Sequence, residues 1–397
     1  MLLRLGKKTA FSIIKTSFAA TSPLVAIDYN TILFISFHGG GFSCNPKYIY
    51  QELRQDERFK DFNFVWALKD TSIDIPGAKV VKYNSLEYFY CLAKSKFWIS
   101  NCKLPEFCVK KKNQIYINTW HGVPLKRLAH SITANSNTFY RSKVSRAEML
   151  KSYDIDTKRY SYLISPNSFT TEKYQECFKV SKDIIKEYGY PRNDFLVNLT
   201  NDQVLDLKNK LNLPKDKKVL LYCPTFRDNS FNKNGYTFNL NLDFNKWKYH
   251  LGKEYVVIFK PHYSISNTFS NKGMEDFLYI AKPGVDINEL YAVSDVLITD
   301  YSSTFFDYAI LNRPILFYMY DLEEYKEDLR GFYLNIYKDL PGEIIEDENK
   351  LLDEMKNYDL YLEKNISKLE EFNLIYNNFQ DGNCSKKVAE ILFNKGK

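Results

Sequence analysis

The segment 296–307 contains the side chains of this chain best suited to binding an anion. An apolar run, 296–299, reads as a buried strand and ends at Asp300. The hydroxyl cluster that follows consists of Ser302, Ser303 and Thr304. Thr304 and Asp307 have the spacing of a helix-capping pair, and hydroxyls with free backbone N–H groups at a helix start form a natural phosphate site. An ordinary capped turn would use the same residues, so this segment alone leaves both interpretations open.

Other segments also place polar residues directly after a predicted strand. They are 38–41, 120–127, 223–228 and 260–262. The chain has five His, and three of them, His38, His121 and His262, occupy such positions. A single Gly, Pro or His in a turn is ordinary turn chemistry. In an open parallel sheet, however, ligands bind beyond the carboxyl ends of the strands, so the coincidence favours one shared site between two sheets.

The residue types at these positions suit the transfer of a phosphate-bearing group. Lysine, arginine and backbone N–H groups hold phosphates, and a histidine removes a proton from an alcohol. An unperturbed histidine has a pKa of about 6.5 and acts as a base at neutral pH. Paired carboxylates at acid–base spacing, a nucleophile elbow, a Walker phosphate loop and a zinc-protease motif are all absent from the sequence.

Strand-like runs alternate with helical patterns along the chain, which predicts an α/β fold with parallel sheets. The predicted strands are 31–37, 62–68, 79–82, 97–100, 114–119, 160–164, 184–188, 219–222, 255–259, 277–280, 296–299 and 315–318. Predicted helices include 46–55, 86–93, 168–178 and 286–293, and 343–397 reads as amphipathic helices. At 397 residues the chain exceeds one average domain, so we expect two domains that meet between residues 150 and 215.

The composition narrows the class of partner. A net charge of +7 suits phosphorylated molecules or an anionic membrane surface. No zinc-finger spacing, RNA-recognition signature or dense arginine stripe is present, so no nucleic-acid partner is expected. The seven Cys are scattered without a CxxC pair, which favours a reducing compartment. No uncharged apolar run reaches the roughly 18 residues that a membrane span needs.

The N-terminal segment 1–29 is basic and amphipathic. Its basic residues are Arg4, Lys7, Lys8 and Lys15, with Leu, Ile and Phe between them. Lys15 interrupts the apolar core that a signal peptide requires. Two interpretations remain: a basic amphipathic helix that lies on a membrane surface, and a helix packed on the first domain.

Taken together, the chain resembles the CDP-glycerol glycerophosphotransferase family of wall teichoic acid primases and polymerases and their capsule-synthesis relatives. The matching segments are 34–37, 45–47, 118–122, 124–127, 189–194, 222–228, 295–314, 320–325 and 330–333. The resemblance runs from about residue 30 to the C-terminus. It implies a GT-B-like α/β fold in which two Rossmann-like domains face a central cleft: an acceptor domain, 30–170, and a CDP-alditol-binding domain, 171–397, with C-terminal helices.

The resemblance also implies an activity and a role for each residue. The family transfers glycerol phosphate, or ribitol phosphate, from a CDP-alditol to a hydroxyl acceptor and releases CMP. His121 is then the candidate base for the acceptor hydroxyl, and His262 steadies the diphosphate or the leaving phosphate. Ser302, Ser303 and Thr304 bind the donor phosphates, Arg227 clamps a phosphate, and Asp300 orients the loop. No cofactor and no metal ion are expected.

Two features depart from the family pattern. Lys260 precedes His262 where many relatives have Arg, and a Lys supplies the charge without the bidentate fork. The long N-terminal extension of the large polymerases is absent, so we expect a single minimal unit.

The family's acceptors are lipid-linked, which implies a peripheral location on the inner, cytoplasmic face of the membrane. The basic segment 126–146, which begins with Lys126 and Arg127, is expected to meet anionic lipid near the acceptor; a solvated helix face is the alternative.

Other functions remain open at this stage. A GT-B glycosyltransferase using a nucleotide sugar is the nearest enzymatic alternative, and a non-catalytic scaffold of a surface-polymer assembly complex is the alternative of another class. The sequence does not separate glycerol from ribitol, primase from polymerase, or teichoic acid from capsule. It does not identify the acceptor or the oligomeric state.

Overall fold

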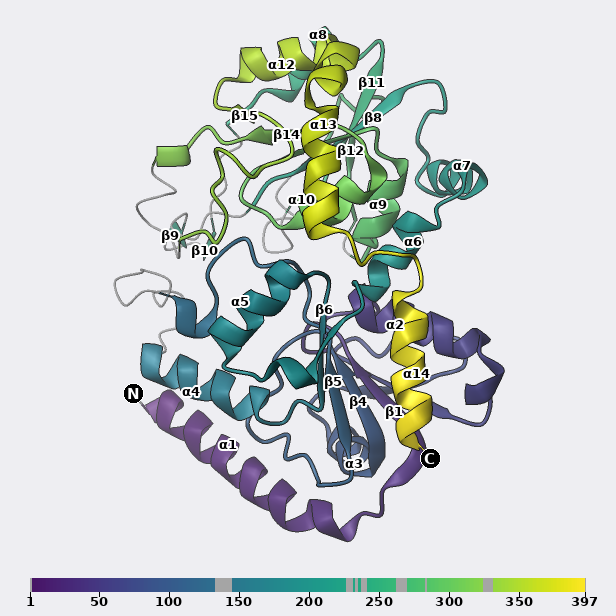
Figure 1. The fold of residues 1–397 in the computed structure, drawn as a ribbon, viewed down its shortest axis with the longest axis vertical. Coiled ribbons are helices and arrows are strands. Elements are labelled where there is room, and N and C mark those ends of the chain that lie inside the picture. The colour runs from purple at the N-terminus through teal and green to yellow at the C-terminus, as the bar shows by residue number, and fades with distance from the viewer. Residues whose placement is uncertain are drawn as a thin grey trace.

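Figure 1 shows two α/β domains arranged along the long axis of the molecule, with both chain ends at the first domain. This computed structural model describes residues 2–132, 145–225, 231–232, 235–236, 241–261, 270–282, 284–323 and 331–396.

The first domain is built on a parallel sheet with the strand order β3-β2-β1-β4-β5-β6-β7. Its strands are β1 (Asp28–Ile35), β2 (Asn63–Leu68), β3 (Lys79–Lys82), β4 (Ser95–Ser100), β5 (Ile115–Asn118), β6 (Tyr162–Ser165) and β7 (Ile185–Glu187). Its helices are α1 (Leu2–Thr21), α2 (Cys44–Gln55), α3 (Leu86–Lys94), α4 (Arg146–Thr157) and α5 (Ser168–Phe178), with short turns η1 (Ser22–Leu24), η2 (Glu57–Phe59), η3 (Ala129–Ser131) and η5 (Lys182–Ile184). The strand order reverses between β1 and β4, the point where doubly wound folds bind their ligands.

The second domain repeats this plan with the order β12-β11-β8-β13-β14-β15, again with parallel pairing. Its strands are β8 (Lys218–Cys223), β11 (Tyr255–Phe259), β12 (Leu278–Ile280), β13 (Val296–Thr299), β14 (Ile315–Tyr318) and β15 (Ile344–Ile345), and a separate antiparallel pair consists of β9 (Phe231–Asn232) and β10 (Gly235–Tyr236). The helices are η6 (Pro191–Asn193), α6 (Asp194–Val197), α7 (Asn201–Lys210), α8 (Phe244–Leu251), α9 (Ile287–Val293), α10 (Thr304–Tyr308), η8 (Ala309–Leu311), α12 (Glu348–Lys356), α13 (Tyr358–Tyr376) and α14 (Cys384–Gly396). The order reverses here between β8 and β13.

Both sheets are buried on both faces, and this explains why the strands were predictable. Successive side chains of a strand point to opposite faces: Leu33 packs with Tyr88 on one face of the first sheet, whereas Phe34 packs with Ile49 on the other. Strands of this kind read as continuous apolar runs, and all the predicted strands are confirmed to within three residues. The strands β9, β10 and β15 were not predicted, because each is only two residues long.

The end of the chain returns to the first domain. Helix α14 packs beside α2, and its Val388 and Leu392 lie in the same core as Phe34 (Figure 1). The first sheet also continues through β7, beyond residue 170. The boundary expected at residue 170 therefore does not coincide with the end of the first sheet, and the first domain contains both ends of the chain.

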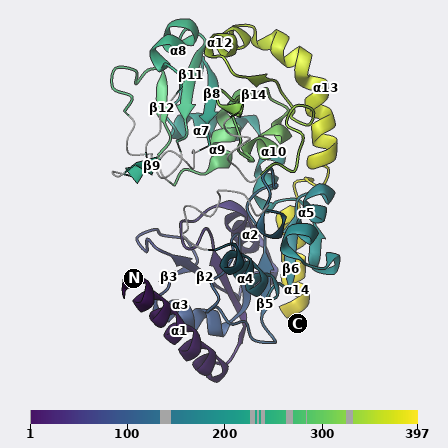
Figure 2. The same ribbon diagram turned by 90° about the vertical axis from the view of Figure 1, so that its left-hand side faces the viewer.

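Helix α1 lies along the outer side of the first domain, as Figure 2 shows. Phe18 is 5% exposed and packs on Phe89 with ring centroids 5.7 Å apart, and Lys15 pairs with Glu106 at 3.1 Å. The helix is thus packed on the domain by one side, while Ile13 remains 60% exposed. Within the described residues, no helix is both long and apolar enough to cross a membrane.

Candidate active site

The turn after β5 touches the hydroxyl cluster that follows β13. A Cβ atom added to Gly122 would lie 2.9 Å from the Oγ of Ser303, closer than such atoms approach, so a larger residue here would force the Ser303 side chain to move. The His121–Gly122 turn of the first domain therefore lies directly against the Ser302–Thr304 cluster of the second domain. Two of the segments that were expected to share one site between the sheets are therefore in contact.

His121 is held in a defined orientation at the end of β5. Its Nδ1 lies 2.6 Å from the backbone carbonyl oxygen of Asn101, which follows β4. Because a carbonyl only accepts hydrogen bonds, Nδ1 carries the proton and Nε2 has the free lone pair. The Trp120 ring stacks on the imidazole at 4.6 Å, and Phe37 meets its edge at 5.5 Å.

The electrostatic environment keeps His121 neutral. The surrounding protein desolvates the imidazole and lowers the pKa of His121 to about 4, although the residue is exposed by its surface area; the bond to the Asn101 carbonyl opposes this shift, and the positive charges of Arg192 and His38 add to it. The residue keeps an exposed surface, so water and a substrate hydroxyl can reach the imidazole. At neutral pH the Nε2 atom can accept a proton, as a general base must.

Arg192 connects this turn to the second domain. Its Nη1 donates to the carbonyl oxygen of His121 at 2.9 Å, and its Nε and Nη2 donate to Asp307 of α10 at 3.1 and 2.6 Å. Its backbone N–H donates to Asn45, and the Asn45 amide donates to the carbonyl of Trp120, both at 3.1 Å. Arg192 is 6% exposed and Asp307 is 4% exposed. This buried ion pair fixes the turn that bears His121 to the helix after the hydroxyl cluster.

The helix start after β13 differs from the prediction. The residue before α10 is Ser303, whose side chain makes no capping bond. The capping pair predicted for Thr304 and Asp307 is wrong, because Asp307 turns towards Arg192 and also accepts from Asn193 at 2.9 Å. Ser302, Ser303 and Thr304 are all partly exposed residues.

Two further predicted residues lie at the strand ends of the second domain. Asp300 is 2% exposed and accepts from the backbone N–H of Thr225 at 2.8 Å, so it ties the loop after β8 to the loop after β13. Lys260 follows β11 and donates its backbone N–H to the carbonyl oxygen of Tyr222 at 2.9 Å. Burial raises the pKa of Cys223 to about 12 and the Lys260 charge opposes this rise, which places the ammonium near the same strand ends.

Lys126 and Arg127 lie at the contact between the domains, in an extended segment rather than on a helix. The backbone N–H of Arg127 donates to Gly331 at 3.0 Å, and that of Tyr333 donates to Leu125 at 2.9 Å. Lys126 forms an isolated antiparallel bridge with Phe332. The helix-face interpretation of the segment 126–146 is therefore wrong for its first two residues.

The remaining predicted site residues, Arg227 and His262, lie outside the described residues. Within the residues that are described, no group of three or more His, Cys, Asp or Glu side chains is placed to hold a metal ion.

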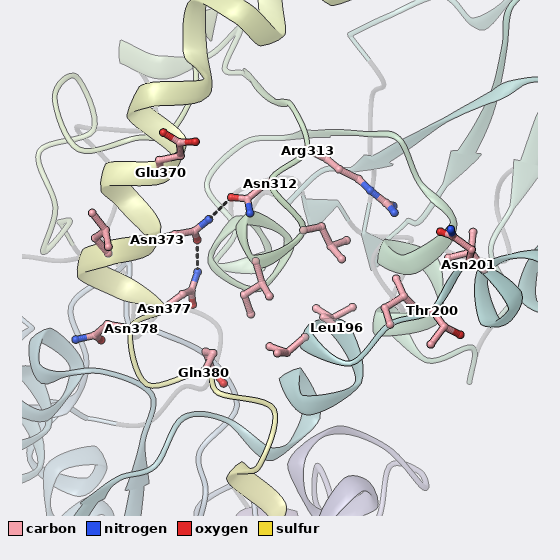
Figure 3. A pocket seen from close by; sticks show the side chains of 16 residues that line it. Leu196, Thr200, Asn201, Asn312, Arg313, Glu370, Asn373, Asn377, Asn378 and Gln380 are labelled. Carbon is pink, nitrogen blue, oxygen red and sulfur yellow. Dashed lines mark hydrogen bonds between the residues drawn. The ribbon is translucent and has the colours of Figure 1, made fainter.

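A cavity of about 790 Å³ lies elsewhere, between α7, η8 and α13 (Figure 3). Its lining includes none of the strand-end segments. The amide of Asn373 donates to Asn312 at 2.9 Å and to the Ala309 carbonyl at 2.7 Å, and Asn377 donates to Asn373 at 2.8 Å. These amides hold α13 against the turn after α10, so the cavity is separate from the candidate active site.

Two doubly wound domains that face each other through their strand ends define a GT-B-like protein, as predicted. The chain belongs to the family CDP-Glycerol:Poly(glycerophosphate) glycerophosphotransferase, whose model matches residues 17–394.

Similar proteins are known in this family. The chain is 39% identical over 367 residues to the teichoic acid poly(glycerol phosphate) polymerase of Staphylococcus epidermidis, covering 91% of this chain but only 50% of that protein. It is 35% identical over 393 residues to the teichoic acid glycerol-phosphate transferase of Staphylococcus aureus, covering 98% of each. The structure of a variant of the wall teichoic acid polymerase TagF soaked with CDPG matches with a TM-score of 0.90 at 35% identity, covering 100% of this chain and 97% of that one.

Sequence reasoning missed the residues that position His121. Asn101 directly follows a predicted strand, so the strand-end rule was sufficient to find it. Arg192 and Asn45 lie in segments that match the family, but nothing local in the sequence indicates that they meet at one turn.

Proposed function

We propose that this chain transfers glycerol phosphate from CDP-glycerol to a hydroxyl of a lipid-linked or polymeric acceptor, with release of CMP, in teichoic acid synthesis. The observation that carries the proposal is the contact between the His121–Gly122 turn and Ser303. It puts a neutral base from one domain beside hydroxyl groups from the other, as phosphate transfer to an alcohol requires.

The reaction follows from this arrangement. The acceptor hydroxyl donates to Nε2 of His121, which takes its proton as the oxygen attacks the phosphorus that bears glycerol. A new P–O bond forms, the P–O bond to CMP breaks, and CMP leaves with that electron pair. The Asn101 carbonyl accepts from Nδ1 and stabilises the imidazolium that results.

The second domain supplies the donor side. Hydroxyls of Ser302, Ser303 and Thr304 and the Lys260 ammonium bind the diphosphate and its developing charge. We assign the same task to Arg227 and His262, as phosphate clamp and as support for the leaving phosphate. Asp300 positions the loop through Thr225. The expected chemistry uses these protein groups without a metal ion or cofactor.

The location that we propose is the cytoplasmic face of the membrane. Helix α1 exposes Ile13 and Ile14 next to Lys15, and Leu24 beyond it is 84% exposed. Apolar side chains beside basic ones suit an interface with anionic lipid. Lys126 and Arg127 lie at the contact between the domains, and we assign them to the acceptor side.

The test is CMP release from CDP-glycerol or CDP-ribitol by the purified protein with a lipid-linked acceptor. We expect release from CDP-glycerol and a fall of at least about 100-fold in the variant His121→Asn, the typical contribution of a general base. His250→Asn is the matched control, because His250 is an exposed residue of α8.

Other donors decide between the alternatives. Turnover of UDP-sugars in place of CDP-glycerol would establish a glycosyltransferase. Absence of turnover with every donor, from folded protein, would favour the scaffold.

A further inference from the structure

A second group of basic residues lies at the strand ends of the first domain, next to His121. His38 follows β1, Lys69 follows β2 directly, and Lys103 comes shortly after β4. Backbone contacts join these positions: the N–H of Lys69 donates to the carbonyl of Gly39 at 2.8 Å, and the N–H of His38 donates to the Cys102 sulfur at 3.3 Å. The three basic residues therefore share one edge of the sheet, at the point where its strand order reverses.

The charges of this cluster interact with one another. Burial lowers the pKa of His38 first, and the positive charges of Lys69 and Lys103 lower it further. Burial likewise lowers the pKa of Lys103, whose ammonium donates to Ser152 at 2.6 Å and lies 4.3 Å from the centre of the Tyr153 ring. The positive charges of Lys69 and Lys103 thus disfavour the imidazolium of His38, and an anion bound beside these side chains would be stabilising.

Nearby carboxylates do not neutralise the cluster. The acids that act on Lys103 are Asp156 and Glu106. Asp156 pairs with Arg159, and Glu106 pairs with Lys15 at 3.1 Å. Among the described residues, neither Lys69 nor Lys103 has a carboxylate oxygen within the 4.0 Å of an ion pair.

The cluster adjoins the proposed base through a strained turn. Phe37, His38 and Gly39 have φ angles of 44°, 55° and 77°, a left-handed run that is costly for the first two. Asn101 holds this run by accepting from the N–H of Phe37 at 2.8 Å, and the same residue's carbonyl holds the ring of His121. Strain of this kind collects at functional sites.

We propose that His38, Lys69 and Lys103 bind the phosphodiester of the acceptor chain, one glycerol unit away from the hydroxyl that His121 deprotonates. The proposal rests on the proposed function and adds the residues that would bind the acceptor, a chain that already ends in phosphodiester-linked glycerol. Each transfer creates a new phosphodiester at the end of the chain, and this subsite binds that phosphodiester in the following transfer. The subsite therefore favours chain extension.

The kinetic test compares two acceptors that both end in glycerol, one with a phosphodiester beside that glycerol and one with a neutral ether. In Lys69→Gln and in Lys103→Gln, we expect the preference for the phosphodiester acceptor to fall about tenfold, because KM for that acceptor rises. A tenfold change is what the loss of one charge-assisted hydrogen bond produces. Lys112→Gln is the control, since Lys112 is an exposed lysine that precedes β5, at the opposite edge of the same sheet. An unchanged preference in both variants overturns the subsite.

A binding measurement separates this proposal from the proposed function. The probe is glycerophosphoglycerol, and the readout is the NMR titration of the His38 imidazole, identified by its loss in His38→Asn. We expect the probe to raise the pKa of His38 in the unmodified protein, and to have a much smaller effect in Lys69→Gln, where the exposed lysine is replaced with little risk to folding. If the probe binds but no transfer from CDP-glycerol occurs, the proposed subsite stands and the proposed transferase activity is wrong. If transfer occurs but the probe does not bind, the transferase activity stands and the subsite is wrong.

Discussion

At the scale of single residues, the surroundings of His121 suit the role of base that we propose for it. The Asn101 carbonyl fixes the tautomer, and burial together with nearby positive charge disfavours the imidazolium. A histidine with a pKa of about 4 is a weaker base than a free one, but it is almost entirely in its reactive form at neutral pH. The donor substrate brings negative charge, which raises the pKa again when it binds.

This environment predicts the pH dependence of the reaction. Because protonation of Nε2 removes the base, kcat/KM should be flat near neutral pH and fall only as the pH drops towards about 4, the pKa of His121 in the free enzyme. The variant His38→Asn removes a positive charge and should move this acid limb to higher pH. The acid limb for kcat should lie at higher pH than the acid limb for kcat/KM, because the bound donor raises the pKa of His121. If kcat/KM in the unmodified protein instead falls near the ordinary histidine pKa, the proposed environment of His121 is contradicted.

At the scale of elements, a buried ion pair joins η6 to α10. Arg192 and Asp307 are both almost fully buried, and Arg192 also bonds the carbonyl of His121. Breaking a buried pair by removing one partner leaves an uncompensated charge, whereas replacing both with apolar residues is often neutral. Variants of this pair can therefore separate its contribution to the stability of the fold from its contribution to the position of His121.

We expect Arg192→Met to lower the free energy of unfolding by about 3–5 kcal/mol, because it leaves Asp307 buried and unpaired. The double variant Arg192→Met with Asp307→Leu should recover most of that loss in denaturant titrations. If Arg192 also positions His121, the double variant still has a reduced kcat with little change in KM for CDP-glycerol. Recovery of kcat together with stability would show that the pair is only structural.

At the scale of the whole molecule, local patterns and distant contacts were not equally predictable. Strands 255–259, 296–299 and 315–318 were predicted to the residue, because burial on both faces leaves an unbroken apolar run. The return of α14 to the first domain was not predicted, since an amphipathic helix does not encode which core it joins. The capping pair failed for the same reason: Asp307 has a stronger partner in Arg192, 115 positions away in the sequence.

Several contacts hold the two domains face to face. Lys47 of α2 pairs with Asp286, which caps α9, at 2.5 Å, and the Tyr48 hydroxyl donates to the same carboxylate at 3.2 Å. Val123 and Leu125, which follow a strand of the first domain, are buried in the core of the second. The close approach of Gly122 to Ser303 is thus a property of the assembled molecule.

That approach can be tested through stability. In Gly122→Ala the new methyl group meets the Ser303 Oγ at 2.9 Å, and we expect overpacking to lower the free energy of unfolding by about 1–3 kcal/mol. Adding Ser303→Ala should relieve the conflict, because the Ser303 Cβ lies 3.7 Å away, at ordinary contact distance. Gly41→Ala is the control, since nothing lies within 4 Å of a Cβ at Gly41. If Gly122→Ala is as stable as the control, either the Ser303 hydroxyl rotates away at no cost or the two segments lie further apart in solution, and in both cases the contact does not constrain the turn.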